Sequence, residues 1–277
     1  MKNELKTIAI VFACFVAALW IAKPLRELLI NYNMPELDAR LIAGILPRLL
    51  IVIGAIRMIN KLGLKAYNGF TKGQKIKNMN AIVIPSTFII LGVIANWNTY
   101  TEAGSYLLLL FTFSVIIVGM AEELVFRGII QPLFIRHFNK RKKSLYLSAV
   151  ITALIFGLIH YINLLKEPDN FWGITSQVVF AFSIGVFFGG LTLRTGSILV
   201  PSIFHGLVNF AFGTGDLKQQ PLQAATKEIS EGINWSSIIP TTLFFAFILL
   251  GGIYMIRKVS TEEVSIKLGI EMGATET

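Results

Sequence analysis

One run of the sequence, SYLLLLFTFSVIIVGMAEELVFRGIIQPLFI at residues 105–135, is predominantly apolar and carries only three charged residues, Glu122, Glu123 and Arg127. A helix of about 20 apolar residues is long enough to cross a bilayer, so this run can span a membrane. Seven further apolar segments follow the same pattern, at residues 7–22, 41–59, 81–96, 144–164, 174–193, 197–212 and 237–256. The sequence therefore predicts an all-α bundle of about eight transmembrane helices.

The composition also favours a membrane protein. The 277 residues are 54% hydrophobic and only 15% charged, and the mean hydropathy is +0.67, whereas a soluble domain carries about 25% charged residues. The net charge is +9, but the Lys and Arg residues cluster in short loops between apolar runs, so nucleic acid is not expected as a partner. The single cysteine, Cys14, excludes an intrachain disulfide and a cysteine zinc cluster.

The distribution of Lys and Arg predicts the orientation in the bilayer, because cytoplasmic loops are enriched in these residues. Basic residues gather at the N-terminus, in the loop 60–80, in the turn 136–143 and in the tail after residue 256. With eight spans all four segments fall on one side of the membrane. We therefore expect both termini to be cytoplasmic. The Lys- and Ile-rich composition is typical of a low-GC bacterium, so the bacterial cell membrane is the expected location.

The three charges inside the run 105–135 need an explanation, since each charge near the bilayer centre costs about 2.5–3.5 kcal/mol on insertion scales. Glu123 and Arg127 are four residues apart, so they share a helix face and can form an ion pair. Glu122 is rotated from Glu123 by about 100° and cannot easily share the same arginine. We therefore predict that Glu122 performs chemistry and that Glu123 and Arg127 support it.

Two of the three histidines also lie in apolar runs. His160 follows Phe156 by one helical turn, and His205 precedes Asn209 by one turn on the segment 197–212. A lone histidine in a span can simply be a hydrogen-bonded packing residue, but two of them beside an unexplained glutamate indicate a site. The third, His137, lies among basic loop residues and is expected to be solvated.

These groups suit the hydrolysis of a peptide bond. A carboxylate in a poorly solvated site is a stronger base than usual, so Glu122 can take a proton from water. His160 can orient that water. His205 and Asn209 carry N–H groups that can hold the oxyanion of a tetrahedral intermediate. The spacing of these residues does not by itself prove proteolysis.

The same residues resemble the motifs of a family of intramembrane endopeptidases that includes the type II CAAX prenyl proteases and the bacterial Abi or CPBP proteins. The family motifs are a glutamate pair with a following arginine, Phe-x-x-x-His, and His-x-x-x-Asn or Asp. The chain matches them in order on successive spans, with Glu122-Glu123-x-x-x-Arg127, Phe156-x-x-x-His160 and His205-x-x-x-Asn209. The resemblance covers residues 105–212, the expected catalytic core. Residues 1–104 would form three spans before it, and residues 213–277 an extracytoplasmic loop, the last span and a cytoplasmic tail.

The resemblance implies a role for each motif residue. Glu122 and His160 would activate the water, and His205 and Asn209 would form the oxyanion hole. The resemblance gives Glu123 and Arg127 a supporting role, and Phe156 is positioned to wall the site. The expected substrate is a membrane-embedded or lipidated peptide or protein. Because prenylated CAAX substrates are not expected in a low-GC bacterium, peptide maturation and bacteriocin self-immunity join CAAX-type processing as expected settings.

The sequence favours a glutamate mechanism without a metal cofactor over a zinc mechanism. It lacks a His-Glu-x-x-His pair on one helix, the usual signature of a zinc hydrolase. If zinc is bound, the ligands would be Glu122, His160 and His205, contributed by three different helices. Those three ligands would leave no free carboxylate as the general base.

Other classes of function stay open at the level of the sequence. A proton-coupled transporter could use Glu122 and the histidines as a relay. A non-catalytic immunity or scaffold protein could share the fold, and a haem protein could use His160 and His205 as axial ligands. Gly213-Thr214-Gly215-Asp216 matches the short signature of intramembrane aspartyl proteases, but it lies at the edge of a span and no second aspartate lies in any span.

Overall fold

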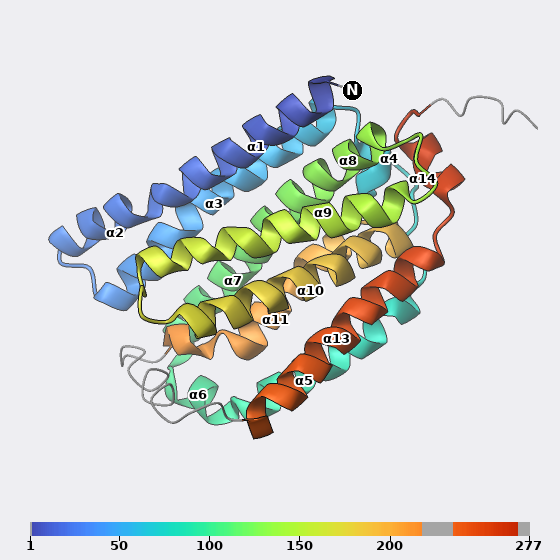
Figure 1. Ribbon diagram of the computed structural model, residues 1–277. Coiled ribbons are helices and arrows are strands. Elements are labelled where there is room, and N and C mark those ends of the chain that lie inside the picture. The colour runs from blue at the N-terminus through green and yellow to red at the C-terminus, as the bar shows by residue number, and fades with distance from the viewer. Residues whose placement is uncertain (1, 218–234, 271–277) are drawn as a thin grey trace, which may run out of the picture.

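The computed structural model describes residues 2–217 and 235–270, and helices are the only regular elements in these two ranges (Figure 1). The α-helices are α1 (Lys2–Trp20), α2 (Ala22–Asn31), α3 (Glu36–Lys61), α4 (Lys65–Asn68), α5 (Val83–Ala95), α6 (Trp97–Glu102), α7 (Ser105–Val125), α8 (Gln131–His137), α9 (Ser144–Leu158), α10 (Phe171–Thr195), α11 (Leu199–Phe212), α13 (Trp235–Arg257) and α14 (Thr261–Lys267). Short 3-10 helices cover Met79–Ile82, Ile159–Leu165 and Thr214–Leu217, and a π-helix covers Phe126–Ile130.

The helices confirm the predicted all-α membrane bundle. Six of them are long and apolar enough to cross a bilayer, at Asn3–Asn31, Glu36–Lys61, Ser105–His137, Ser144–Leu165, Phe171–Thr195 and Ile239–Arg257. Two shorter apolar helices, Met79–Ala95 and Leu199–Phe212, correspond to the remaining predicted segments. The eight apolar segments of the sequence are therefore all helical, although two of them are shorter than a full span.

Large apolar side chains cover the outside of the bundle. Leu50 on α3, Leu109 on α7 and Leu250 on α13 are each more than 60% exposed. Exposed leucines over the full length of several helices are costly in water but are favourable in the hydrocarbon core of a bilayer. The outer surface is thus that of an integral membrane protein.

The first apolar helical stretch, Asn3–Asn31, is longer than the predicted segment 7–22 and is divided into two helices. Helix α1 ends at Trp20, and after Ile21 the chain continues as α2 to Asn31. The break lies where Pro24 lacks the N–H that would bond to the carbonyl of Trp20. Arg26 and Glu27 are therefore part of a helix.

The helices near the candidate site differ in detail from the spans predicted from the sequence. The run 105–137 is one continuous helical stretch, but Phe126–Ile130 is wound as a π-helix, a feature often found at functional sites. Helix α9 ends at Leu158, so His160 lies on the following 3-10 helix and not within the predicted α-helical span. Pro201 lies in the first turn of α11, where its missing N–H removes no helical hydrogen bond.

Helix α7 lies in the middle of the bundle, where it packs against α11 and α3 (Figure 1). A Cβ atom on Gly119 of α7 would lie 2.5 Å from the backbone nitrogen of Gly206 on α11. A glycine on each helix therefore lets the two backbones approach closely, as small residues do in membrane bundles. This close approach brings the glutamates of α7 within reach of His205.

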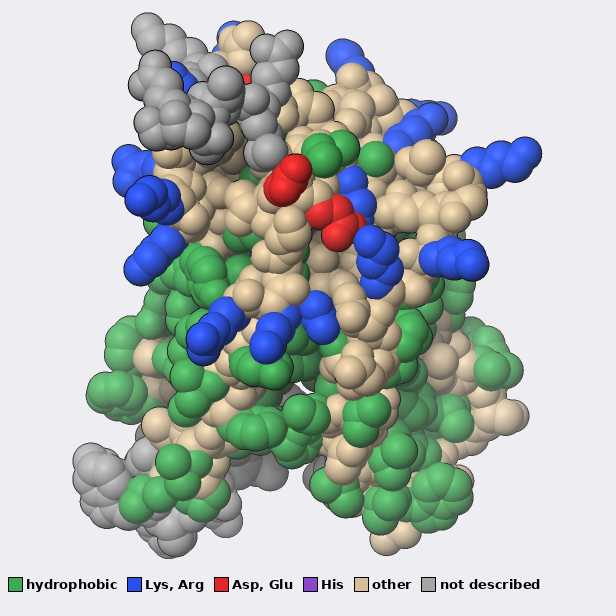
Figure 2. Space-filling model, turned by 90° about the vertical axis from the view of Figure 1, so that its right-hand side faces the viewer, with side chains coloured by type: hydrophobic (Ala, Val, Ile, Leu, Met, Phe, Trp, Pro, Cys, Tyr) green, Lys and Arg blue, Asp and Glu red, His purple; other side chains and the backbone are tan. Residues whose placement is uncertain are grey.

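The basic loops meet at one end of the bundle. Arg136 donates hydrogen bonds to the carbonyl oxygens of Leu62 at 3.0 Å and Leu268 at 3.0 Å, and Lys77 forms an ion pair with Glu263 at 2.8 Å. Figure 1 shows the N-terminus, α4, α8 and α14 at this end, and Figure 2 shows the Lys and Arg side chains gathered on it. The common end agrees with the predicted even number of spans, and its cytoplasmic location stays a prediction.

We expect reporter fusions after residues 70, 140 and 265 all to report the cytoplasm, because the basic loops follow the positive-inside rule. Alkaline phosphatase and green fluorescent protein fusions measure this directly, since each is active on only one side of the membrane. A periplasmic signal from any one of the three positions would contradict the topology.

Candidate active site

A buried ion pair forms the base of the site. The Nη1 atom of Arg127 donates to Oε1 of Glu123 at 2.8 Å, and both side chains are 0% exposed. The pair predicted from the four-residue spacing is therefore present. The guanidinium also lies over the ring of Phe156, with Cζ 4.5 Å from the ring centroid, so a cation–π contact helps to hold it.

His205 connects α11 to both glutamates of α7. Its Nδ1 atom lies 2.8 Å from Oε1 of Glu123, and its Nε2 atom lies 3.5 Å from Oε2 of Glu122. The Glu123 carboxylate, paired with Arg127, can only accept hydrogen bonds, so Nδ1 of His205 carries a hydrogen. This contact fixes the orientation of the imidazole and directs Nε2 toward Glu122.

The two adjacent glutamates have different surroundings. Glu123 is fully buried and accepts hydrogen bonds from Arg127 and His205. The Glu122 side chain is 15% exposed, and it makes the longer approach to His205, at 3.5 Å. One carboxylate is therefore fixed in the packing, while the other is accessible to a water molecule or a substrate. This is the division that the helix geometry of the sequence predicts.

His160 lies half-buried beyond the end of α9. Its Nδ1 atom is 2.9 Å from the carbonyl oxygen of Phe156. A carbonyl only accepts, so Nδ1 carries the hydrogen, and Nε2 of the neutral ring is an acceptor. The ring of Phe156 meets His160 edge-on at 5.2 Å and His205 edge-on at 5.9 Å between centroids. Phe156 thus lies between the two histidines and holds both rings.

The other polar residues singled out in the sequence are Asn209 and His137. Asn209 is half-buried and follows His205 by one turn of α11, so both project from the same helix face. His137 was expected to be solvated, but it is half-buried, with its ring 4.8 Å from that of Phe138. Gly213 and the 3-10 helix Thr214–Leu217 follow the end of α11, outside the spans.

Two residues of α10 complete the site, and the sequence analysis missed both. Phe188 stacks on the His205 ring with 5.3 Å between centroids and 27° between planes. Gly185 leaves space for Arg127, because a Cβ atom there would lie 2.9 Å from Nη2 of the arginine. The spacing of Gly185 and Gly189 by four residues is a small-residue pattern that indicates a close helix contact and could have identified this face.

A metal site is not preformed in the described part of the chain, where no group of three or more His, Cys, Asp or Glu side chains is arranged to hold a metal ion. Glu122 and His205 face each other, and each histidine bonds through Nδ1, His205 to Glu123 and His160 to a backbone carbonyl, which leaves Nε2 of both rings available to a water or a metal. If zinc is bound, Glu122, His160 and His205 would have to converge on it, and among the described residues they do not form such a group.

The helix bundle and its buried carboxylate–imidazole cluster define a polytopic membrane protein with a polar site inside the bundle. Residues 103–211 match the family described as Rce1-like, type II CAAX prenyl endopeptidase Rce1-like. The match includes all three motifs and confirms the resemblance seen in the sequence. It supports a CAAX-type intramembrane endopeptidase that acts on a membrane-associated substrate. No curated protein and no solved structure matches the chain.

The buried pair and the free glutamate should respond differently to mutation. We expect Glu123→Gln and Arg127→Leu each to lower the free energy of unfolding by about 3–5 kcal/mol, because removing one partner leaves a buried charge without compensation. Glu122→Gln is the matched control, since its carboxylate has no arginine partner, and it should unfold close to the wild type. Thermal and chemical unfolding in detergent measures all three. Equal losses in the three variants would contradict this division.

Proposed function

We propose that the protein is an intramembrane endopeptidase that hydrolyses a peptide bond of a membrane-associated peptide or protein with a water molecule activated by Glu122 and His160. The observation that carries the proposal is the unequal environment of the two adjacent glutamates. Glu123 is fixed by Arg127 and His205, and Glu122 has an accessible carboxylate beside an oriented imidazole. A purely structural role would explain the first carboxylate but not the second.

The first step is the activation of water. Glu122 takes a proton from the water as general base. His160 is suited to orient the same water, since Nδ1 donates to Phe156 and leaves Nε2 as a hydrogen-bond acceptor. The water oxygen then attacks the carbonyl carbon of the substrate, and the carbonyl π electrons move to its oxygen. The products of this step are a tetrahedral oxyanion and a protonated Glu122.

The oxyanion is stabilised from α11. Asn209 donates from its side-chain amide. His205 in its doubly protonated form donates from Nε2, while Nδ1 keeps its bond to Glu123. Such donors act strongly when they are held in place before the reaction, and the Glu123–Arg127 pair provides this support for His205. When the tetrahedral intermediate collapses, the C–N bond breaks and Glu122 returns its proton to the leaving amine.

The substrate class follows from the location of the site. The catalytic groups lie inside a helix bundle whose outer surface is apolar, so a substrate must be able to enter from, or lie against, the membrane. A membrane-embedded or lipidated peptide meets this requirement. Peptide maturation and bacteriocin self-immunity are settings in which a bacterium uses such a reaction.

Removing the general base should abolish cleavage without unfolding the protein. Glu122→Gln should lose activity and accumulate normally in the membrane, because the amide cannot accept the proton. His205→Ala and Asn209→Ala should each lower turnover about 100- to 1,000-fold, the usual effect of losing one oxyanion donor. Comparison of the membrane peptides of wild-type and Glu122→Gln cells by mass spectrometry identifies the substrate and measures the loss. Full activity of Glu122→Gln would refute the assignment of Glu122 as the general base.

We expect the purified active protein to work without tightly bound zinc. In the glutamate mechanism each polar group has a role, whereas three protein ligands for zinc would occupy Glu122, His160 and His205 and leave no base. Elemental analysis of the active protein, followed by chelation and re-addition of zinc, measures the requirement. About one zinc per chain, with activity lost on removal and restored on return, would overturn the mechanism.

A further inference from the structure

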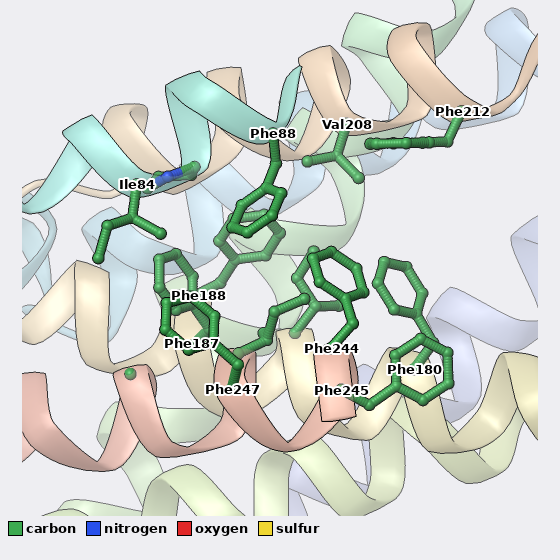
Figure 3. A pocket seen from close by; sticks show the side chains of 14 residues that line it. Ile84, Phe88, Phe180, Phe187, Phe188, Val208, Phe212, Phe244, Phe245 and Phe247 are labelled. Atoms are coloured by element: carbon green, nitrogen blue, oxygen red, sulfur yellow. The ribbon is translucent and has the colours of Figure 1, made fainter. Parts of the chain in front are cut away.

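A second feature of the bundle is a cavity of about 270 Å³ between α5, α10, α11 and α13 (Figure 3). Fourteen residues line it, and every one of them is apolar or glycine. Eight of the fourteen are phenylalanines. Figure 3 shows Phe88 of α5 pointing toward Phe187 and Phe188 of α10 and Phe244 of α13.

The chemistry of the wall restricts the occupant. A peptide segment would bring N–H and C=O groups that need hydrogen-bond partners, and a buried polar group without a partner is unfavourable by several kcal/mol. The cavity offers no polar side chain to such a group. The cavity therefore suits a single hydrocarbon chain.

The mouth of the cavity is continuous with the lipid-facing surface. Ile84 on α5, Phe212 on α11 and Phe247 on α13 line the cavity and are 48%, 54% and 49% exposed. On a membrane-spanning bundle these exposed apolar residues face the hydrocarbon of the bilayer. A lipid chain can therefore enter sideways without leaving its own environment.

Aromatic contacts frame this entrance. The ring of Phe88 on α5 meets Phe244 and Phe247 of α13, with centroids 4.8 Å and 6.1 Å apart. Helices α5 and α13 thus meet here through aromatic side chains, whose rotamers can change without a shift of the backbone.

Phe188 separates the cavity from the reacting groups. It lines the cavity, it is 0% exposed, and it also stacks on His205. An occupant of the cavity would therefore touch Phe188 and not Glu122 or His160. A lipid attached to a substrate at the scissile bond would have to pass this ring, whereas a lipid of the bilayer would not.

We propose that the cavity binds one acyl chain of a bilayer phospholipid, which enters between α5 and α13 and ends against Phe188. The lipid is a resident component of the folded protein. Its acyl chain fills the cavity next to Phe188, the ring that stacks on His205. The proposal concerns binding and goes beyond the peptidase function. Its test needs no peptide cleavage, so the failure of one proposal is distinguishable from the failure of the other.

The test uses full-length protein in vesicles of phosphatidylethanolamine and phosphatidylglycerol that contain a phospholipid with a diazirine at the end of one acyl chain. After illumination, mass spectrometry should locate labels on cavity residues of α5, α10 and α13. Gly251→Leu should reduce this labelling at least fivefold, because Gly251 lines the cavity and a Cβ atom there has 3.5 Å to the nearest atom of Phe187. Ile84→Trp at the mouth should do the same if the first variant does not fold.

Gly54→Leu is the matched control, since Gly54 lies exposed on α3 and nothing lies within 4 Å of a Cβ atom there. It should keep the wild-type labelling of the cavity. Labelling that is equal in wild type and Gly251→Leu, or absent from the cavity residues of the wild type, would overturn the proposal. Displacement of the label by a farnesylated peptide but not by unlabelled phospholipid would also overturn it, and would assign the cavity to a substrate.

Discussion

The rest of the site depends on the hydrogen bonds that the buried carboxylate of Glu123 accepts. One oxygen atom accepts hydrogen bonds from Arg127 on its own helical stretch and from His205 on α11. In a bundle with an apolar exterior this carboxylate has no bulk water to solvate it, so both donors are needed. The contact therefore ties α7 to α11 and fixes the imidazole of His205. The close approach of Gly119 to Gly206 makes the contact geometrically possible.

The same constraint explains why two adjacent glutamates differ. A buried ion pair is weak evidence for added stability, because desolvation of both charges offsets their attraction. In this protein the Glu123–Arg127 pair instead positions a neighbour, because Glu123 holds the His205 ring with Nε2 directed toward Glu122. The 100° rotation between neighbouring helical residues then keeps Glu122 away from the arginine. One glutamate is used for structure, and the other remains available for chemistry.

The family match and the cavity involve different parts of the bundle. Residues 103–211 contain α7 to α11 and therefore the whole candidate site. The cavity is built by α10 and α11 from inside this range and by α5 and α13 from outside it. Phe188 belongs to both features, as it stacks on His205 and lines the cavity. Phe188 therefore links the cavity to the candidate site.

The sequence by itself determined the class of fold, the eight apolar segments and the division between Glu122 and Glu123, because hydropathy and helical spacing are local properties. It did not reveal the π-helix at Phe126–Ile130, the 3-10 helix that carries His160, or the roles of Gly185 and Phe188. Those features depend on which helix faces meet. The bond from His205 to Glu123 joins residues 82 positions apart, and only the packing of α11 on α7 decides which carboxylate the imidazole contacts.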